Sequence, residues 1–305
     1  MTDGDPDEVV PGARVAFLVG AGRSGTTLLY KLLCLHPQIA YISNYENRFG
    51  WFPDGIAGRA VAGKLDEKLR AWFDKGNAYF IDRPWLKKIF PTPHEGESVF
   101  GACGIPLFPT PDYLPDATAA ACLRRRFDQI RRRSGASVFL SKRTANNRRI
   151  RQLSAIFPGA RYVHLVRDGR EVAQSLSTVE WWDEHTVWWD GRTPLEMERG
   201  GEARLAICAR NWVREVQELR VQLAPVDRSQ LLVLRFEELL RDPLHHLERV
   251  VSFLGVDFPA GYRSAIETLG LRPVRARWAS DWDTDQLVSV LEAAQPMLHE
   301  LGYCE

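Results

Sequence analysis

Residues 20–27 read Gly-Ala-Gly-Arg-Ser-Gly-Thr-Thr and constrain the fold of this chain more than any other segment. An apolar run, residues 15–19, precedes them, and a helix-like run, residues 28–33, follows. A glycine-rich turn between a strand and a helix presents backbone N–H groups at a helix N-terminus, where the helix dipole favours an anion. The segment therefore predicts a phosphate-binding loop in a P-loop-like fold.

The loop departs from the nucleotide-binding pattern GxxxxGK[ST], whose lysine reaches the terminal phosphates of a magnesium-bound triphosphate. Gly20 and Gly25 have the spacing of that pattern, but Thr26 occupies the lysine position. The cation lies upstream instead, at Arg23. We therefore expect a phosphorylated ligand other than a magnesium triphosphate.

Strand-like and helix-like patterns alternate along the chain, as a parallel sheet requires. The expected strands are residues 15–19, 39–42, 138–141, 161–166 and 231–234. The expected helices are residues 26–35, 146–157, 169–177, 202–223, 243–254 and 284–301. This order predicts a three-layer α/β fold, in which a central parallel sheet of about five strands has helices on both faces.

The 305 residues are expected to form one domain, residues 14–305, after a disordered tail, residues 1–13, that is too polar for a signal peptide. The strand and helix alternation stops at about 49–135, which indicates an insertion with helices at 64–75 and 118–133. Open α/β sheets bind ligands at the carboxyl ends of their strands. We therefore expect this insertion to be a mainly helical cap over the active site.

Composition excludes several partners. The net charge of +1 argues against a nucleic-acid partner, and no apolar stretch is long enough to span a membrane. The five cysteines are odd in number and form no CxxC pair, which predicts reduced thiols in a cytoplasmic protein. The excess of arginine over lysine is typical of a GC-rich bacterial genome. No pattern indicates an oligomeric state.

A second anion site is predicted around residues 161–175. The expected strand ends at Val166 and delivers Arg167 to the sheet edge on which Arg23 also lies, and Ser175 follows eight positions later on a helix. An arginine and a serine in this arrangement can hold one phosphate from two sides. The alternative interpretation is that Arg167 pairs with a neighbouring carboxylate such as Asp168.

In combination these motifs resemble the sulfotransferases that use 3′-phosphoadenosine-5′-phosphosulfate (PAPS). The resemblance rests on residues 23–27 and on Arg167 and Ser175, with support from residues 234–239, 242–243, 253–255 and 301–303. It covers residues 14–48 and 137–303 and implies that PAPS is the sulfuryl donor. The cofactor-binding residues that it implies are Gly22, Arg23, Ser24, Gly25, Thr26, Thr27, Arg167, Ser175, Phe236, Arg277 and Trp278.

The chain is most similar to the branch that includes tyrosylprotein sulfotransferases and many bacterial sulfotransferases. By resemblance, Glu46 is the base that deprotonates the acceptor hydroxyl, although it is displaced by about two residues from the family spacing. Residues 142–147 resemble a Lys-x-Pro-x-x-Asn motif that keeps Lys142 but has lost its proline, and Lys142 would stabilise charge on the leaving group together with Arg23. His94 and Glu95 are the alternative bases.

The acceptor is expected to be a hydroxyl-bearing small molecule such as a natural product, glycan or lipid. The candidate acceptor-binding residues are Trp51, His94, Trp181, Trp182, Trp188 and Trp189. Core packing and acceptor binding are equally good interpretations of the four tryptophans at 181–189. Sulfuryl transfer needs no magnesium, and no clustered metal ligands are expected. The rival functions are a small-molecule kinase of the same fold and an inactive regulatory protein that binds the product, adenosine 3′,5′-bisphosphate (PAP).

Overall fold

The computed structural model describes residues 15–49, 92–108, 113–273 and 276–303. At its centre is a sheet of five strands in the order β2-β3-β1-β4-β5, in which every neighbouring pair is parallel. The strands are β1 (Val15–Val19), β2 (Ile39–Ala40), β3 (Val138–Lys142), β4 (Arg161–Val166) and β5 (Leu231–Arg235). These bounds confirm the predicted sheet.

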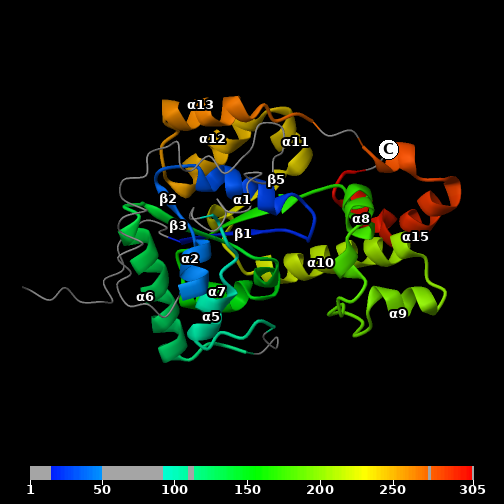
Figure 1. Ribbon diagram of the computed structural model, residues 1–305, viewed down its shortest axis with the longest axis horizontal. Coiled ribbons are helices and arrows are strands. Elements are labelled where there is room, and N and C mark those ends of the chain that lie inside the picture. The colour runs from blue at the N-terminus through cyan, green and yellow to red at the C-terminus, as the bar shows by residue number, and fades with distance from the viewer. Residues whose placement is uncertain (1–14, 50–91, 109–112, 274–275, 304–305) are drawn as a thin grey trace, which may run out of the picture.

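Helices cover both faces of the sheet, which confirms the three-layer prediction (Figure 1). The longer helices are α1 (Thr26–Cys34), α6 (Ala117–Arg133), α8 (Gly169–Ser177), α10 (Arg204–Leu223), α12 (Pro243–Leu254), α13 (Ala260–Leu269) and α15 (Thr284–Glu300). The shorter ones are α2 (Asn44–Phe49), α5 (Glu97–Ala102), α7 (Ile150–Ile156), α9 (Pro194–Arg199), α11 (Phe236–Arg241) and α14 (Trp278–Asp281). Three 3₁₀ turns, η2 (Thr144–Arg148), η3 (Glu180–Trp182) and η4 (Arg228–Gln230), complete the described part of the chain.

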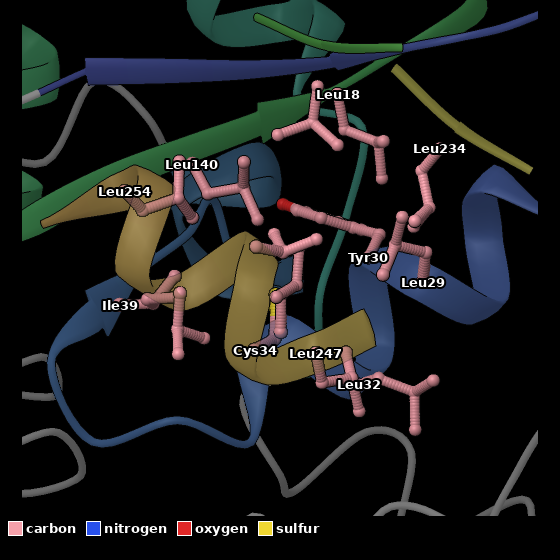
Figure 2. Packing of buried hydrophobic residues seen from close by; sticks show 14 of the residues in the cluster. Leu18, Leu29, Tyr30, Leu32, Cys34, Ile39, Leu140, Leu234, Leu247 and Leu254 are labelled. Atoms are coloured by element: carbon pink, nitrogen blue, oxygen red, sulfur yellow. The ribbon is translucent and has the colours of Figure 1, made fainter. Parts of the chain in front are cut away.

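The two faces of β1 enter two different hydrophobic clusters. Ala16 and Leu18 pack with α1, α11, α12 and α13, and Figure 2 shows the leucines of this cluster around Tyr30. Phe17 and Val19 belong to the opposite cluster, with α5, α6, α7 and the end of α10. Side chains alternate between the two faces of a strand, so an apolar run buried on both sides is the expected pattern for a central parallel strand.

A third cluster extends past the carboxyl ends of the strands and unites α8, α10 and α15. Trp212 on α10 is fully buried there, and a Cβ atom on Gly169 would lie 2.4 Å from its ring. Glycine at the first position of α8 therefore allows α8 to pack closely against α10. This contact fixes α8, which carries one of the predicted anion-binding residues.

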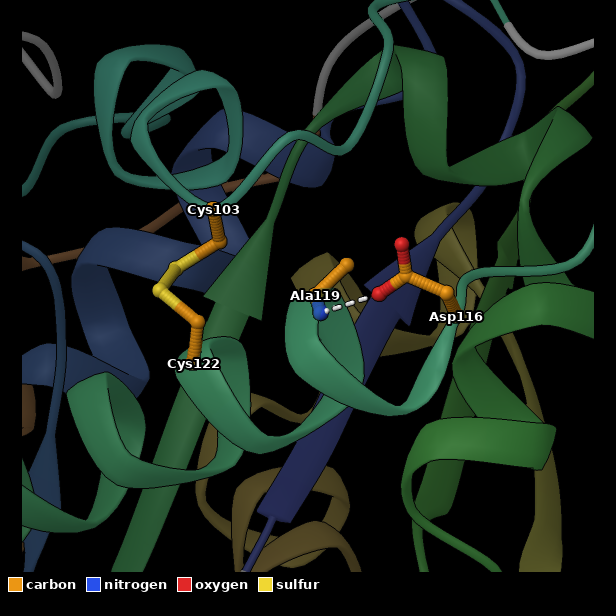
Figure 3. Close-up of a disulfide and its surroundings, with 4 residues drawn as sticks. All are labelled: Cys103, Asp116, Ala119 and Cys122. Carbon is orange, nitrogen blue, oxygen red and sulfur yellow. Dashed lines mark hydrogen bonds between the residues drawn. A yellow bond between two sulfur atoms is a disulfide. The ribbon is translucent and has the colours of Figure 1, made fainter.

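A disulfide between Cys103 and Cys122 joins the end of α5 to α6 (Figure 3). The two Cα atoms lie 5.5 Å apart although the residues are 19 positions apart in sequence. The prediction of reduced thiols is wrong for this pair, because an odd count and the lack of a CxxC motif carry no information about which helices pack together. Cys34 and Cys208 are buried and take no part in this disulfide.

The described part of the insertion packs against the sheet rather than standing apart from it. Residues 92–105 contribute α5 and a bridge between Ser43 and Pro93, and Phe100 lies in the same core as Phe127 of α6. The predicted helix at 118–133 is confirmed as α6. The predicted tail, residues 1–13, and the predicted helix at 64–75 lie outside the described residues. No helix within the described ranges has the length and apolarity to cross a membrane.

Candidate functional site

The phosphate loop, residues 20–27, joins β1 to α1 at the carboxyl edge of the sheet. Gly25 precedes α1 with φ at 87°, in the left-handed region that favours glycine. A Cβ atom at this position would lie 2.2 Å from the ring of Phe236. The loop therefore folds closely over Phe236, and only glycine fits at its turn.

Three of the predicted phosphate-binding residues meet at this loop. Arg23 Nε donates a hydrogen bond to Ser175 Oγ at 3.0 Å, although 152 positions separate the two residues. Arg167 Nη1 donates to the backbone oxygen of Arg23, also at 3.0 Å. Parallel strands deliver their following residues to one edge of the sheet, and this geometry places the end of β4 and the helix after it beside the loop after β1.

Arg167 is held in place by two further contacts. It forms an ion pair with Glu171 one helical turn later, at 3.1 Å, and its guanidinium lies 4.7 Å from the centre of the Phe236 ring. A neighbouring carboxylate thus pairs with Arg167, as the alternative interpretation predicts, but it is Glu171; Asp168 pairs with Arg170, at 2.7 Å. The guanidinium of Arg167 is therefore positioned at the loop, supported by the aromatic ring that also underlies Gly25.

The loop contains groups that a bound anion would satisfy. Ser24 Oγ is buried and makes no hydrogen bond. A Cβ atom on Gly22 would meet no atom within 4 Å, so the space above its backbone is open. No side chain caps the N-terminus of α1, which begins at Thr26 and Thr27. A buried hydroxyl without a partner is costly, and a phosphate oxygen would supply the missing acceptor.

Lys142, the last residue of β3, lies beside the same loop. Its side chain is 6% exposed, and Nζ donates to Thr27 Oγ1 at 3.2 Å and to Glu95 Oε1 at 2.5 Å. The ammonium group that a phosphate loop usually carries at the position of Thr26 is thus supplied from the neighbouring strand. Glu95, one of the two alternative bases, is the carboxylate that the fold brings to Lys142.

Glu46 has a different environment. Its Oε2 atom accepts from the backbone N–H of Ser43 at 2.9 Å, while the backbone N–H of Glu46 donates to Ser43 Oγ at 3.3 Å. This reciprocal pair is a capping box at the start of α2. The sequence Ser43-Asn44-Tyr45-Glu46 contains the capping pattern, and the sequence analysis missed it.

His94 is positioned by its backbone and its ring. Its N–H donates to the Ile42 carbonyl at 2.7 Å, and its Nδ1 accepts from the backbone N–H of Gly96 at 3.0 Å. Burial lowers the pKa of His94. The imidazole is therefore neutral near pH 7, and its backbone joins the segment that carries Glu95 to the chain before α2.

Trp278 packs against Arg170 in the first turn of α8. This helix begins two positions after Arg167. The guanidinium of Arg170 lies 4.2 Å from the centre of the Trp278 ring and donates to the Tyr303 carbonyl at 3.0 Å. Trp278 Nε1 is buried and without a hydrogen-bond partner, while Arg277 is exposed. The C-terminal segment thus reaches the edge of the sheet that carries the phosphate loop.

The four tryptophans at 181–189 differ in how far their side chains are buried. Trp182 is 2% exposed and lies in the core with α8 and α10, which agrees with the core-packing interpretation of this residue. Trp189 is half-buried and donates to Asn211 Oδ1 at 3.0 Å. Trp181 and Trp188 are 59% and 39% exposed. Trp51, the remaining predicted tryptophan, lies outside the described residues.

Asn147, at the asparagine position of the Lys-x-Pro-x-x-Asn motif, and Glu215, which has no sequence signal, hold the phosphate loop from behind. Asn147 donates to the Gly20 carbonyl at 2.9 Å and accepts from the Gly20 N–H at 3.2 Å. The buried carboxylate of Glu215 accepts from Asn147 at 3.0 Å. An amide and a carboxylate 68 positions apart form no sequence motif, so only the fold reveals this pair.

Among the described residues, no group of three or more His, Cys, Asp or Glu side chains could hold a metal ion.

Comparison with known proteins agrees with this geometry. The model of the sulfotransferase family matches residues 16–260. The structure is similar to the sulfotransferase STF9 from Mycobacterium avium (TM-score 0.58, 14% identity, covering 95% of this chain and 77% of that one). It is also similar to the sulfotransferase STF1 from Mycobacterium tuberculosis (TM-score 0.55, 17% identity, 93% and 77%). A third similar structure is the sulfotransferase domain from the curacin biosynthetic pathway (TM-score 0.50, 13% identity, 92% and 96%). No curated protein matches the sequence.

Proposed function

Because the chain belongs to the sulfotransferase family, we propose that it transfers a sulfuryl group from PAPS to a hydroxyl of a small-molecule acceptor. The observation that carries this proposal is the meeting of Arg23, Arg167 and Ser175 at the phosphate loop. The phosphate loop offers one anion site, and Arg167 with Ser175 offers a second beside it. A nucleotide with one phosphate on the 5′ and another on the 3′ position of its ribose matches such a pair.

The residues of the loop fit the 5′-phosphate end of this nucleotide. The partnerless hydroxyl of Ser24, the open space at Gly22 and the uncapped N-terminus of α1 all accommodate an anion. Arg167 and Ser175 would hold the 3′-phosphate, one by bidentate charge and the other by its hydroxyl. Phe236 supports this site from below, since its ring contacts both the loop and Arg167.

When bound, PAPS supplies the sulfuryl group, and its 5′-phosphate leaves with added negative charge. Lys142 is the chain's principal means of stabilising that charge, because its ammonium group lies within hydrogen-bond distance of the loop residue Thr27. Burial of the lysine side chain in a site of low dielectric strengthens its electrostatic effect. Arg23 contributes a second positive charge from the loop itself.

The acceptor hydroxyl must lose its proton, and a carboxylate is the base that we propose. Glu46 and Glu95 are the candidates. Position favours Glu95, because its carboxylate contacts Lys142 and Lys142 contacts the loop residue Thr27, whereas the carboxylate of Glu46 lies in the capping box at the start of α2. We assign the base to Glu95. When Lys142 turns toward the leaving phosphate, its ion pair with Glu95 breaks, and the carboxylate is then free to accept the proton of the acceptor hydroxyl.

A kinase of the same fold is the alternative, and Thr26 in place of the loop lysine argues against it. Titration calorimetry with PAP and, separately, with ATP and magnesium distinguishes the two. We expect PAP to bind at least tenfold more tightly than ATP with magnesium. Tight binding of ATP with magnesium and none of PAP would refute the proposed function.

A further inference from the structure

A cluster of exposed aromatic side chains is linked to the phosphate loop through Glu215 and Asn147, and we propose that it is the subsite for an aromatic ring on an uncharged acceptor. This proposal rests on the proposed function, since it concerns the acceptor of that reaction. The cluster consists of Phe108 and Trp188 on either side of Arg148, together with His185 and Trp181, whose rings contact each other. Within the described part of the chain, the exposed large hydrophobic side chains include three aromatic ones, and these are Phe108, Trp181 and Trp188 of the cluster.

Arg148 forms the centre of the cluster. Its guanidinium lies 5.5 Å from the centre of the Phe108 ring and 5.1 Å from that of Trp188. Phe108 follows α5, Arg148 ends η2, and Trp188 lies between η3 and α9, so three distant segments contribute. His185 lies 5.7 Å from Trp181, ring centre to ring centre, and burial, followed by the charge of Arg148, lowers the pKa of His185.

A buried carboxylate holds this cluster in place. Glu215 Oε1 accepts from Arg148 Nη1 and from Trp188 Nε1, both at 2.7 Å. Its other oxygen accepts from Asn147, which holds the backbone of Gly20 in the phosphate loop. A side chain fixed in this way loses little conformational entropy when a ligand binds. The position of Trp188 is therefore set relative to the loop before any acceptor arrives.

The charge balance of the cluster determines which acceptors fit it. Arg148 is ion-paired with Glu215, so the two charges at the centre of the cluster balance each other. The exposed parts of Phe108, Trp181 and Trp188 are apolar ring surfaces, which favour stacked or edge contacts with another ring. η2, which ends at Arg148, begins two positions after Lys142, so the segment that carries the proposed catalytic lysine continues into the cluster.

Binding to the PAP-loaded protein tests this inference without requiring turnover. The probes are 2-naphthol and its saturated counterpart decahydro-2-naphthol, which share the hydroxyl and the two-ring frame but differ in aromaticity. Aromatic contacts add about 0.5–1.5 kcal/mol to burial alone, so we expect calorimetry to give several-fold tighter binding of 2-naphthol. Equal affinities for the two probes would overturn the proposal.

Variants locate the probe on the protein. Phe108→Ala and Trp188→Ala should each weaken 2-naphthol binding several-fold, leave the affinity for PAP unchanged and hardly affect the saturated probe. Phe108→Ala removes no hydrogen bond, whereas Trp188→Ala removes the one to Glu215. Thermal melting checks that both variants are folded. Leu195→Ala, an exposed apolar residue of α9 outside the cluster, is the matched control. Unchanged 2-naphthol affinity in both cluster variants would also overturn the proposal, whereas failure to bind PAP would instead refute the proposed function.

Discussion

The two halves of the candidate site are built in different ways. The half around the phosphate loop consists of short sequence motifs, each following a strand at the same edge of the sheet. The half around Lys142, Glu95 and the aromatic cluster is assembled from single residues that belong to no common motif. Backbone N–H groups and a helix terminus can bind phosphate in any protein, so the first half follows general rules. The second half must fit one particular acceptor, and it follows no general rule.

The largest effect should come from the acceptor half. Glu95→Gln keeps the size of the side chain and removes the basic oxygen, so we expect turnover with PAPS to fall by about 10²-fold or more. PAP affinity, measured by calorimetry, should stay close to that of the unmodified protein. Glu46→Gln is the matched control, and we expect it to weaken the cap of α2 with a much smaller loss of turnover. A larger loss in Glu46→Gln than in Glu95→Gln would return the base to Glu46.

Lys142 joins the two halves, and its removal should affect chemistry rather than binding. We expect Lys142→Ala to reduce the rate of the chemical step by about 10²-fold, the usual effect of losing one charge-stabilising donor. Single-turnover kinetics with labelled PAPS measures that step directly. If turnover is unchanged, Lys142 has no part in the mechanism.

Within the cofactor half, Arg167→Ala should weaken PAP binding by about 10- to 100-fold, because hydrogen bonds to a charged group contribute about 1.5–3 kcal/mol. Adenosine 5′-monophosphate, which lacks the 3′-phosphate, should bind the variant and the parent protein equally. An equal loss for both nucleotides would show that Arg167 supports the loop instead of recognising the 3′-phosphate.

The smallest effect on activity is expected at the disulfide. Cys103→Ser combined with Cys122→Ser should lower the free energy of unfolding by about 3 kcal/mol, the value typical of a loop of this length. PAP affinity should remain unchanged, since neither cysteine contacts the loop. Denaturant unfolding and calorimetry on the same preparations check both parts, and a loss of PAP affinity would show that the linked helices support the cofactor half.

The sequence predicts the cofactor half well because its signals are local. The five strands, α8 and the meeting of Arg23 with Ser175 and Arg167 follow from apolar runs, spacing and the common direction of parallel strands. The predicted helix at 146–157 is only partly right, because η2 precedes α7 and the buried Arg149 separates the two.

The acceptor half was predicted poorly because its contacts are set by packing. Glu95 was one of three candidate bases, and nothing in its neighbours points to Lys142. Glu215 belongs to an ordinary amphipathic helix, yet it binds Asn147, Arg148 and Trp188 at once. The pairing of Cys103 with Cys122 depends on how α5 meets α6, which no periodicity reveals.

The most direct measurement of the central claim is a crystal structure of the protein with PAP. We expect the 5′-phosphate to lie against the backbone of residues 22–27, with one of its oxygens within hydrogen-bond distance of Ser24 Oγ. The claim also predicts the 3′-phosphate between Arg167 and Ser175, and Lys142 Nζ turned toward the 5′-phosphate. A PAP molecule bound away from the loop, or a 3′-phosphate that contacts neither Arg167 nor Ser175, would contradict it.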